Sequence, residues 1–206
     1  MKLGTKSLLF GAHQFLLHPI FVYAAWAKLY GWTLDPVVIT SFIVHDWGYW
    51  GKENMDGEDG KEHPRLGAKI MHWLFDDHNY LSVCPYHYDQ PCHKSKDWYC
   101  RCFKWHDFSL YHSRSIAKQD EVKPSKLCAA DKLASALMPW WIYVPLTTLT
   151  GEIKEYMQYG KSSKVGGNID TLVHHALHSD SKRWWCWGMQ QFMRNWANSN
   201  VEGAKV

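Results

Sequence analysis

A histidine and an aspartate stand side by side at the end of an apolar run in the first quarter of the chain. His45 and Asp46 follow Val-Val-Ile-Thr-Ser-Phe-Ile-Val (37–44) and precede an aromatic, glycine-containing segment (47–51). An imidazole and a carboxylate are costly to bury against a core without partners. A metal ion would pair with both groups and offset that cost. We therefore treat this doublet as the candidate reactive centre and ask which other side chains reach it.

His18 is the first candidate to join the doublet. It lies on the apolar face of a helix predicted over 8–31, in register with Val22 and Ala25. His13 is the competing imidazole on the same segment. Five residues correspond to about 140° around a helix, so His13 and His18 are not expected to face one ion.

Asp131 is the second candidate. It lies among small and apolar residues in a helix predicted to begin at Pro124. A buried helical carboxylate needs a partner. Together with His18 and the doublet it gives two imidazoles and two carboxylates. This donor set suits a divalent transition-metal ion such as Mn, Fe, Co, Ni or Zn.

The order His, His-Asp, Asp on successive predicted helices resembles the HD-domain superfamily of metal-dependent phosphohydrolases. Residues 63–68, His-Pro-Arg-Leu-Gly-Ala, resemble the His-x-x-x-Gly-Ala segment that supplies a third histidine in the dinuclear branch. Residues 111–113, Tyr-His-Ser, resemble that branch's fourth histidine and its spacing to the final Asp. Bacterial hydrolases that split diadenosine tetraphosphate symmetrically show a similar run. The resemblance covers about residues 13–140.

The resemblance implies a site for one or two ions. The first ion would be held by His18, His45, Asp46 and Asp131. Asp46 would bridge to a second ion held by His63 and His112, and without these two histidines the site would be mononuclear. The competing imidazoles, His72 and His106, are expected to point elsewhere, and the second doublet, His106-Asp107, is expected to be a surface pair.

The function implied by the resemblance is hydrolysis of a nucleotide or dinucleotide by a metal-activated water. Asp46 would be ligand and orienting group, and Arg114 and Lys52 are the cations expected to steady the phosphate. Lys132, next to Asp131, is expected to point away. The chain has no Gly-rich phosphate loop that supports this substrate independently.

Two other functions use the same residues. Some dinuclear HD proteins are di-iron oxygenases with the same six ligands, so ligand spacing does not separate oxidation of a small organic substrate from hydrolysis. A non-catalytic binding module is the third possibility. It is disfavoured, because a module that needs only shape has no reason to bury so many ionisable groups.

The predicted architecture is all-α, a single HD-like helical bundle over 1–206 with a metal-binding core at about 13–140 and a C-terminal helical extension at about 151–206. Further helices are predicted from Pro36 into the His45-Asp46 doublet, and at 64–78, 101–118, 133–151 with a proline bend, 151–159, 169–179 and 182–198. The last carries the stripe Trp185, Met189, Phe192 and Trp196, which indicates core packing or a partner surface. Residues 51–62 are a charged loop, either solvated or a lid, and 161–168 a flexible connection.

Composition limits the partners and the compartment. The net charge of +3 is spread along the chain, so no nucleic-acid partner is expected, and a homo-oligomer is left open. No signal peptide or membrane span is expected, because polar residues interrupt the first apolar stretch and prolines the second. Six cysteines in a chain of 206 residues indicate reduced thiols and a cytoplasmic protein.

The separation of 49 residues between His63 and His112 is longer than the resemblance implies, and the excess is cysteine-rich. Cys84, Cys92, Cys100 and Cys102 would either bind a structural zinc or be ordinary buried thiols. This segment also offers Tyr86, Tyr88 and Trp98 as stacking side chains for a substrate base.

Overall fold

The structure is a computed structural model that describes residues 2–53, 55, 58–76, 104–162, 170–201, 204 and 206. Every regular element in this part of the chain is a helix, which confirms the all-α prediction. In chain order the helices are α1 (Leu3–Phe10), α2 (Leu17–Tyr30), α3 (Pro36–Val44), the short 3-10 helix η1 (Trp47–Tyr49), α4 (Glu58–Lys61), α5 (Pro64–Phe75), α6 (Lys104–Leu110), α7 (Arg114–Gln119), α8 (Lys126–Leu137), α9 (Trp140–Thr150), α10 (Glu152–Ser162), α11 (Thr171–Leu177) and α12 (Lys182–Asn200).

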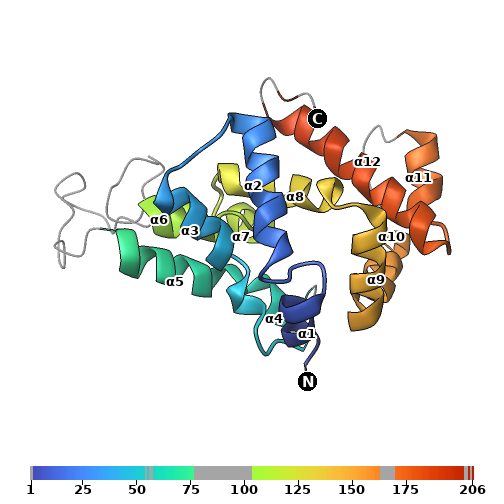
Figure 1. Cartoon of the computed structure of the whole chain (residues 1–206), viewed down its shortest axis with the longest axis horizontal. Helices are drawn as coiled ribbons and strands as arrows, with labels where there is room; N and C mark the ends of the chain where they lie inside the picture. The colour runs from blue at the N-terminus through green and yellow to red at the C-terminus, as the bar shows by residue number, and fades with distance from the viewer. Residues whose placement is uncertain are drawn as a thin grey trace.

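The centre of the molecule is formed by α2, α3 and α8, which meet in one apolar core (Figure 1). Val22 and Ala25 of α2, Phe42 of α3 and Leu133 of α8 are buried there. These positions share one face of each helix, as the spacing of the apolar residues predicts. The start of α2, the end of α3 and the middle of α8 are thereby brought together.

The helices α9 to α12 gather at one end of the molecule around a second apolar core (Figure 1). Met138, Ile153, Trp185 and Met189 are buried in it. Helix α12 also reaches the first core, where Ala197 is fully buried. The C-terminal extension therefore packs directly on the predicted metal-binding core.

The helix predicted over 8–31 is wrong in one respect, because the chain forms two helices with a break at residues 11–16. The backbone N–H of Ala12 donates to the Oε2 atom of Glu152 at 3.0 Å instead of continuing α1. A Cβ atom at Gly11 would lie 2.1 Å from the same oxygen, so only glycine allows this close approach. The break is thus imposed by a residue 140 positions away.

Two other predicted helices are also divided. The helix predicted over 101–118 is interrupted at 111–113, where the Ser113 side chain accepts a hydrogen bond from the N–H of Ile116 and caps α7. The helix predicted over 133–151 is interrupted before Pro139, because a residue that precedes proline is disfavoured in the helical conformation, and Met138 is extended. Pro145 lies inside α9, as predicted.

The elements around the doublet follow their sequence signals. Helix α3 begins with the Asp35 side chain accepting from the N–H of Val37 and with Pro36 in the first helical position, as predicted. Helix α5 begins at Pro64, also as predicted. The predicted loop at 51–62 contains the short helix α4, and Met55, which precedes α4 in this segment, is buried. None of the helices in the described segments combines the length and apolar character needed to cross a bilayer.

Candidate metal centre

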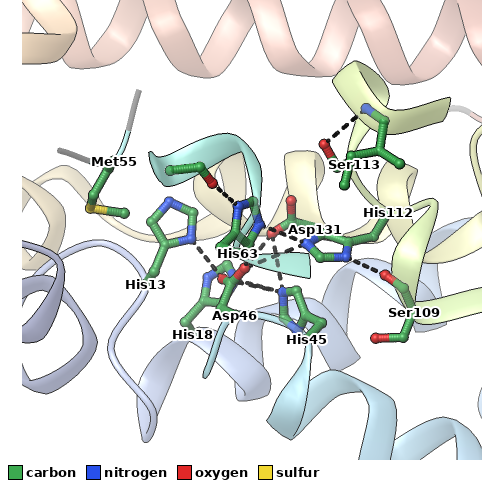
Figure 2. Close-up of polar contacts among 12 residues, drawn as sticks. His13, His18, His45, Asp46, Met55, His63, Ser109, His112, Ser113 and Asp131 are labelled. Atoms are coloured by element: carbon green, nitrogen blue, oxygen red, sulfur yellow. Dashed lines mark hydrogen bonds and ion pairs between the residues drawn. The ribbon is translucent and has the colours of Figure 1, made fainter. Parts of the chain in front are cut away.

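The six predicted ligands come from five parts of the chain and converge on one buried point (Figure 2). His18 lies in the first turn of α2, and Asp131 lies in the middle of α8. The other four stand at helix ends or in turns: His45 directly after α3, Asp46 before η1, His63 before α5 and His112 between α6 and α7. The apolar cores fix these helix ends relative to one another and thus set the geometry of the centre.

The first set of donor atoms surrounds His18 and His45. The Nε2 atom of His18 lies 3.1 Å from Oδ1 of Asp131 and 3.2 Å from Oδ2 of Asp46. The Nε2 atom of His45 lies 3.5 and 3.3 Å from the same two oxygens. The two nitrogens are 3.4 Å apart. Four donor atoms therefore face a common point.

The second set uses the other oxygen of Asp46. Its Oδ1 atom lies 3.4 Å from Nε2 of His63 and 3.5 Å from Nε2 of His112, and these nitrogens are 3.0 Å apart. One carboxylate thus faces two groups of imidazoles, each through a different oxygen. This is the arrangement that a carboxylate bridging two ions requires.

The donor spacings fit a bound ion. Ligand atoms held about 2.1 Å from an ion lie roughly 3.0 Å apart at octahedral angles and roughly 3.4 Å apart at tetrahedral angles. The separations in both sets fall between 3.0 and 3.5 Å. The donor atoms present are therefore spaced as the ligands of a bound metal ion would be.

Hydrogen bonds on the far side of three histidine rings direct the ring nitrogens inward. The Nδ1 atom of each contacts the backbone carbonyl oxygen three residues earlier: His45 to Phe42 at 3.0 Å, His63 to Gly60 at 2.6 Å and His112 to Ser109 at 2.5 Å. With Nδ1–H donating, each ring turns Nε2 toward the cluster, and a ring in its neutral form offers there the lone pair that metal-binding histidines use. Two lone pairs 3.0 Å apart, on His63 and His112, repel each other unless a positive charge lies between them.

His13 is a seventh member of the cluster, and its predicted exclusion was wrong. Its Nδ1 atom lies 2.7 Å from Oδ2 of Asp46. The prediction assumed one continuous helix, whereas the break at residues 11–16 frees His13 to approach Asp46 from outside α2. Gly11 is the sequence signal that could have indicated this break. Tyr49 stacks on His63 with ring centroids 3.8 Å apart and lies beside His13, so it supports both rings.

The charges of the cluster shift its protonation. Burial lowers the pKa of His45 and His13, but attraction to Asp46 outweighs it and raises the values to about 10 and about 9. Burial raises the pKa of Asp46, yet the imidazoles of His45 and His13 hold it well below its usual range. Burial lowers the pKa of His63 to about 4. Burial likewise raises the pKa of Asp131, but its contacts with His18 and His45 hold it well below its usual range. Positive charge beside them therefore keeps both carboxylates ionised, and metal ions would supply the same charge.

A pocket of about 620 Å³ opens beside the centre. His13, Tyr49 and Asp131 line it next to the cluster, together with the cations Arg114 and Lys132. Lys132 forms no ion pair with Asp131 in the described part of the chain, and its ammonium lies 5.9 Å from the centroid of the Trp196 ring. The remaining wall comes from the C-terminal helices and includes Tyr143, Tyr156, Tyr159, Leu177, Trp185, Met189, Phe192 and Met193, which the sequence did not associate with the site.

Several predicted residues lie elsewhere or outside the described segments. Lys52 packs against Gly4, whose backbone N–H donates to the Lys52 carbonyl, and Lys52 is not among the residues that line the pocket. His72 and His106 bond to Asp76 and Asp107, as expected of imidazoles outside the cluster. The proposed cysteine site (Cys84, Cys92, Cys100, Cys102) and the stacking residues Tyr86, Tyr88 and Trp98 lie outside the described residues.

Comparisons of the chain with models of protein families, with curated proteins and with solved structures find no match.

Proposed function

We propose that the protein is a metal-dependent hydrolase of the HD type that cleaves a phosphate ester or anhydride of a nucleotide or dinucleotide. One observation carries this proposal. The two oxygens of Asp46 face two separate groups of imidazole nitrogens, at 3.2 to 3.3 Å on one side and 3.4 to 3.5 Å on the other. A carboxylate placed in this way supports a pair of ions, and paired ions suit in-line attack on phosphorus.

Each residue has a separate task in this proposal. Bound divalent ions would lower the pKa of a water molecule and stabilise charge on the phosphate. His18, His45 and Asp131 would hold the first ion, and His63 and His112 the second, with Asp46 shared. Arg114 and Lys132 line the same pocket as Asp131 and would supply positive charge for the phosphate oxygens. His13 bonds to Asp46 and fixes the orientation of that carboxylate.

The same ligands would also serve a di-iron oxygenase, the alternative considered above. The two pocket cations favour an anionic substrate over a neutral one, and they favour hydrolysis for that reason.

The test compares two carboxylates of the chain. Asp46→Asn keeps the side-chain shape but removes the charge, and Asp107→Asn makes the same change in the second His-Asp doublet, outside the cluster. Proteins loaded with Mn, Co or Fe are assayed against nucleotides, dinucleotides and cyclic nucleotides. We expect Asp46→Asn to lose more than about 100-fold in kcat/KM, because loss of partners that merely orient a metal ligand already costs roughly 10- to 100-fold. Asp107→Asn should retain activity.

Undiminished hydrolysis by folded Asp46→Asn would overturn the proposal. Oxygen consumption by the iron-loaded protein with an organic substrate, without release of phosphate, would assign the centre to oxidation instead.

A further inference from the structure

The pocket beside the metal centre has two chemically different ends. His13, Tyr49 and Asp131 of the cluster region line it together with the cations Arg114 and Lys132, which closely follow His112 and Asp131 in the sequence, and Asp131 is the sole carboxylate among its described lining residues. The wall built by α9, α10, α11 and α12 is aromatic and apolar. A ligand that fills this space therefore needs a negative group at the metal end and a largely apolar body at the other.

The two cations are placed for a free anion. The Arg114 guanidinium lies 5.3 Å and the Lys132 ammonium 5.9 Å from the centroid of the same Trp196 ring. Neither forms an ion pair with a carboxylate in the described part of the chain. Both cations thus lie beside one indole ring and remain available to a phosphate group.

The apolar end is built from fixed aromatic side chains. Trp185 and Tyr143 are each 4% exposed and belong to the second apolar core, so their positions are set before any ligand binds. The ring of Tyr156 lies parallel to that of Trp185, at 5° and 6.5 Å between centroids. Rigid flat walls of this kind favour a flat ring in the ligand, because aromatic groups gain most from stacking contacts.

A donor in this wall also lacks a partner. The Nε1–H of Trp185 is buried and bonds to no acceptor in the described segments. A buried donor left unpaired costs free energy that an acceptor would recover. The position of this indole in the pocket wall, near Gly160, favours a ring with hydrogen-bond acceptors over a plain hydrocarbon.

We propose that the C-terminal helices form a specificity pocket for a flat, heteroaromatic group of the substrate, while Arg114 and Lys132 receive the phosphate attached to it. A volume of about 620 Å³ is ample for a nucleoside-sized body. This inference rests on the proposed hydrolase function for the reaction, but the binding it describes is testable without turnover.

The first experiment compares three phosphate esters that differ in the organic group attached to the phosphate. Adenosine 5′-monophosphate and ribose 5-phosphate share the sugar and the phosphate, and hexyl phosphate presents an apolar but non-planar body. For the metal-loaded protein we expect kcat/KM for the adenosine ester to exceed that for both others by about tenfold or more, the scale that stacking of one base supplies. Equal values for the first two esters, or a preference for hexyl phosphate, would overturn the proposal.

The second experiment narrows the pocket. Ser135 lies on α8 one turn after Asp131 and lines the pocket, so Ser135→Leu fills part of the space beside the ligand. Ser115→Leu places the same side chain at an exposed position of α7 outside the pocket. We expect the ratio of kcat/KM for adenosine 5′-monophosphate to that for ribose 5-phosphate to fall at least fivefold in Ser135→Leu and to stay unchanged in Ser115→Leu. If Ser135→Leu fails to fold, Phe192→Ala serves as the second variant, because it removes one wall of the pocket and should lower the same ratio.

Binding separates this proposal from the proposed function. Calorimetric titration of the metal-loaded protein with each ligand requires no chemistry. If no ester is hydrolysed but adenosine monophosphate binds at least tenfold more tightly than ribose 5-phosphate, the hydrolase assignment fails and the pocket proposal holds. If the two ligands bind equally, or neither binds, the pocket proposal fails whatever the turnover. Lys132→Met should weaken both ligands, whereas Lys126→Met, outside the pocket on the same helix, should weaken neither.

Discussion

Replacing His112 with alanine should reduce the metal content from two ions per chain to one. His112 contributes to the second donor set through Nε2, 3.0 Å from His63 and 3.5 Å from Oδ1 of Asp46. Without it, His63 and Asp46 alone remain on that side. The first set keeps His18, His45, Asp131 and the other oxygen of Asp46, so it should still hold its ion.

The expected size of the effect follows from binding linkage. One site saturated at about 100 times its Kd stabilises the fold by about 2.7 kcal/mol, and two such sites by about 5 kcal/mol. For a chain of this size each kcal/mol corresponds to roughly 2–4 °C in Tm. Adding metal to the metal-free wild type should therefore raise Tm by roughly 10–20 °C. His112→Ala should show about half that rise.

The assay combines thermal unfolding at a fixed free metal concentration, with and without chelator, and metal analysis of the loaded protein. Each variant is compared with its own metal-free form, so any loss of packing cancels. His106→Ala is the matched control, because it removes an imidazole paired with Asp107 outside the cluster. It should keep two ions and the full rise. Two ions in His112→Ala, or one in the wild type, would refute the division of ligands described above.

Three further predictions concern protonation, packing and thiol chemistry. Ion pairing raises the folded-state pKa of His13 to about 9 and that of His45 to about 10. Their protonation therefore stabilises the metal-free protein, with the full contribution present below pH 6.5, the ordinary pKa of histidine. This contribution is lost as the pH rises through 9 to 10. The metal-free Tm should fall over this range, and metal affinity measured by titration should rise with pH as the competing protons leave; a flat profile of both would contradict this. A Cβ atom on Gly67 would lie 2.7 Å from the carbonyl oxygen of Val44 and 2.9 Å from Cα of His45, so Gly67→Ala should cost about 1–3 kcal/mol by overpacking and also weaken metal binding. In Gly188→Ala the new Cβ atom would meet Ala176 at 2.6 Å between α11 and α12, so the free energy of unfolding measured with denaturant should fall by a similar amount while the metal affinity stays unchanged. Equal metal affinity in both variants would show that α5 does not set the centre. Burial raises the pKa of Cys128 to about 11, so this thiol should resist alkylation at pH 8 in the folded protein and react on unfolding; rapid labelling in the native state, read by peptide mass analysis, would be inconsistent with the structure.

Residue types and helix spacing predict four members of the cluster, His18, His45, Asp46 and Asp131, whereas His63 and His112 are implied by the resemblance to HD-domain proteins. The buried doublet needs partners, and the order of the motifs along the chain indicates which helices supply them. The tertiary structure then shows that Asp46 turns one oxygen to each group of imidazoles, a detail that depends on the turn after α3. Spacing along a chain does not contain this information.

The approach of His13 could not be predicted from local periodicity. A single glycine in an apolar segment is only a weak signal that a helix breaks there. The hydrogen bond that stabilises the break comes from Glu152, in another part of the fold. The pocket was missed for a related reason. Trp185 and Met189 belong to a stripe that indicates core packing, and they are indeed buried in the core, but they also line the pocket. One-dimensional patterns do not distinguish a core side chain from one at the edge of a cavity.

The contact between Glu152 and the residue before His13 has a consequence for how this protein can be divided. Glu152 is almost fully buried, and its Oε2 atom accepts from both the Ala12 N–H and the Thr150 hydroxyl. A fragment ending before α10 would contain every predicted metal ligand and yet lose the anchor of the segment that carries His13. The smallest fragment expected to assemble this centre therefore extends beyond the ligands themselves and includes the start of α10, which carries Glu152.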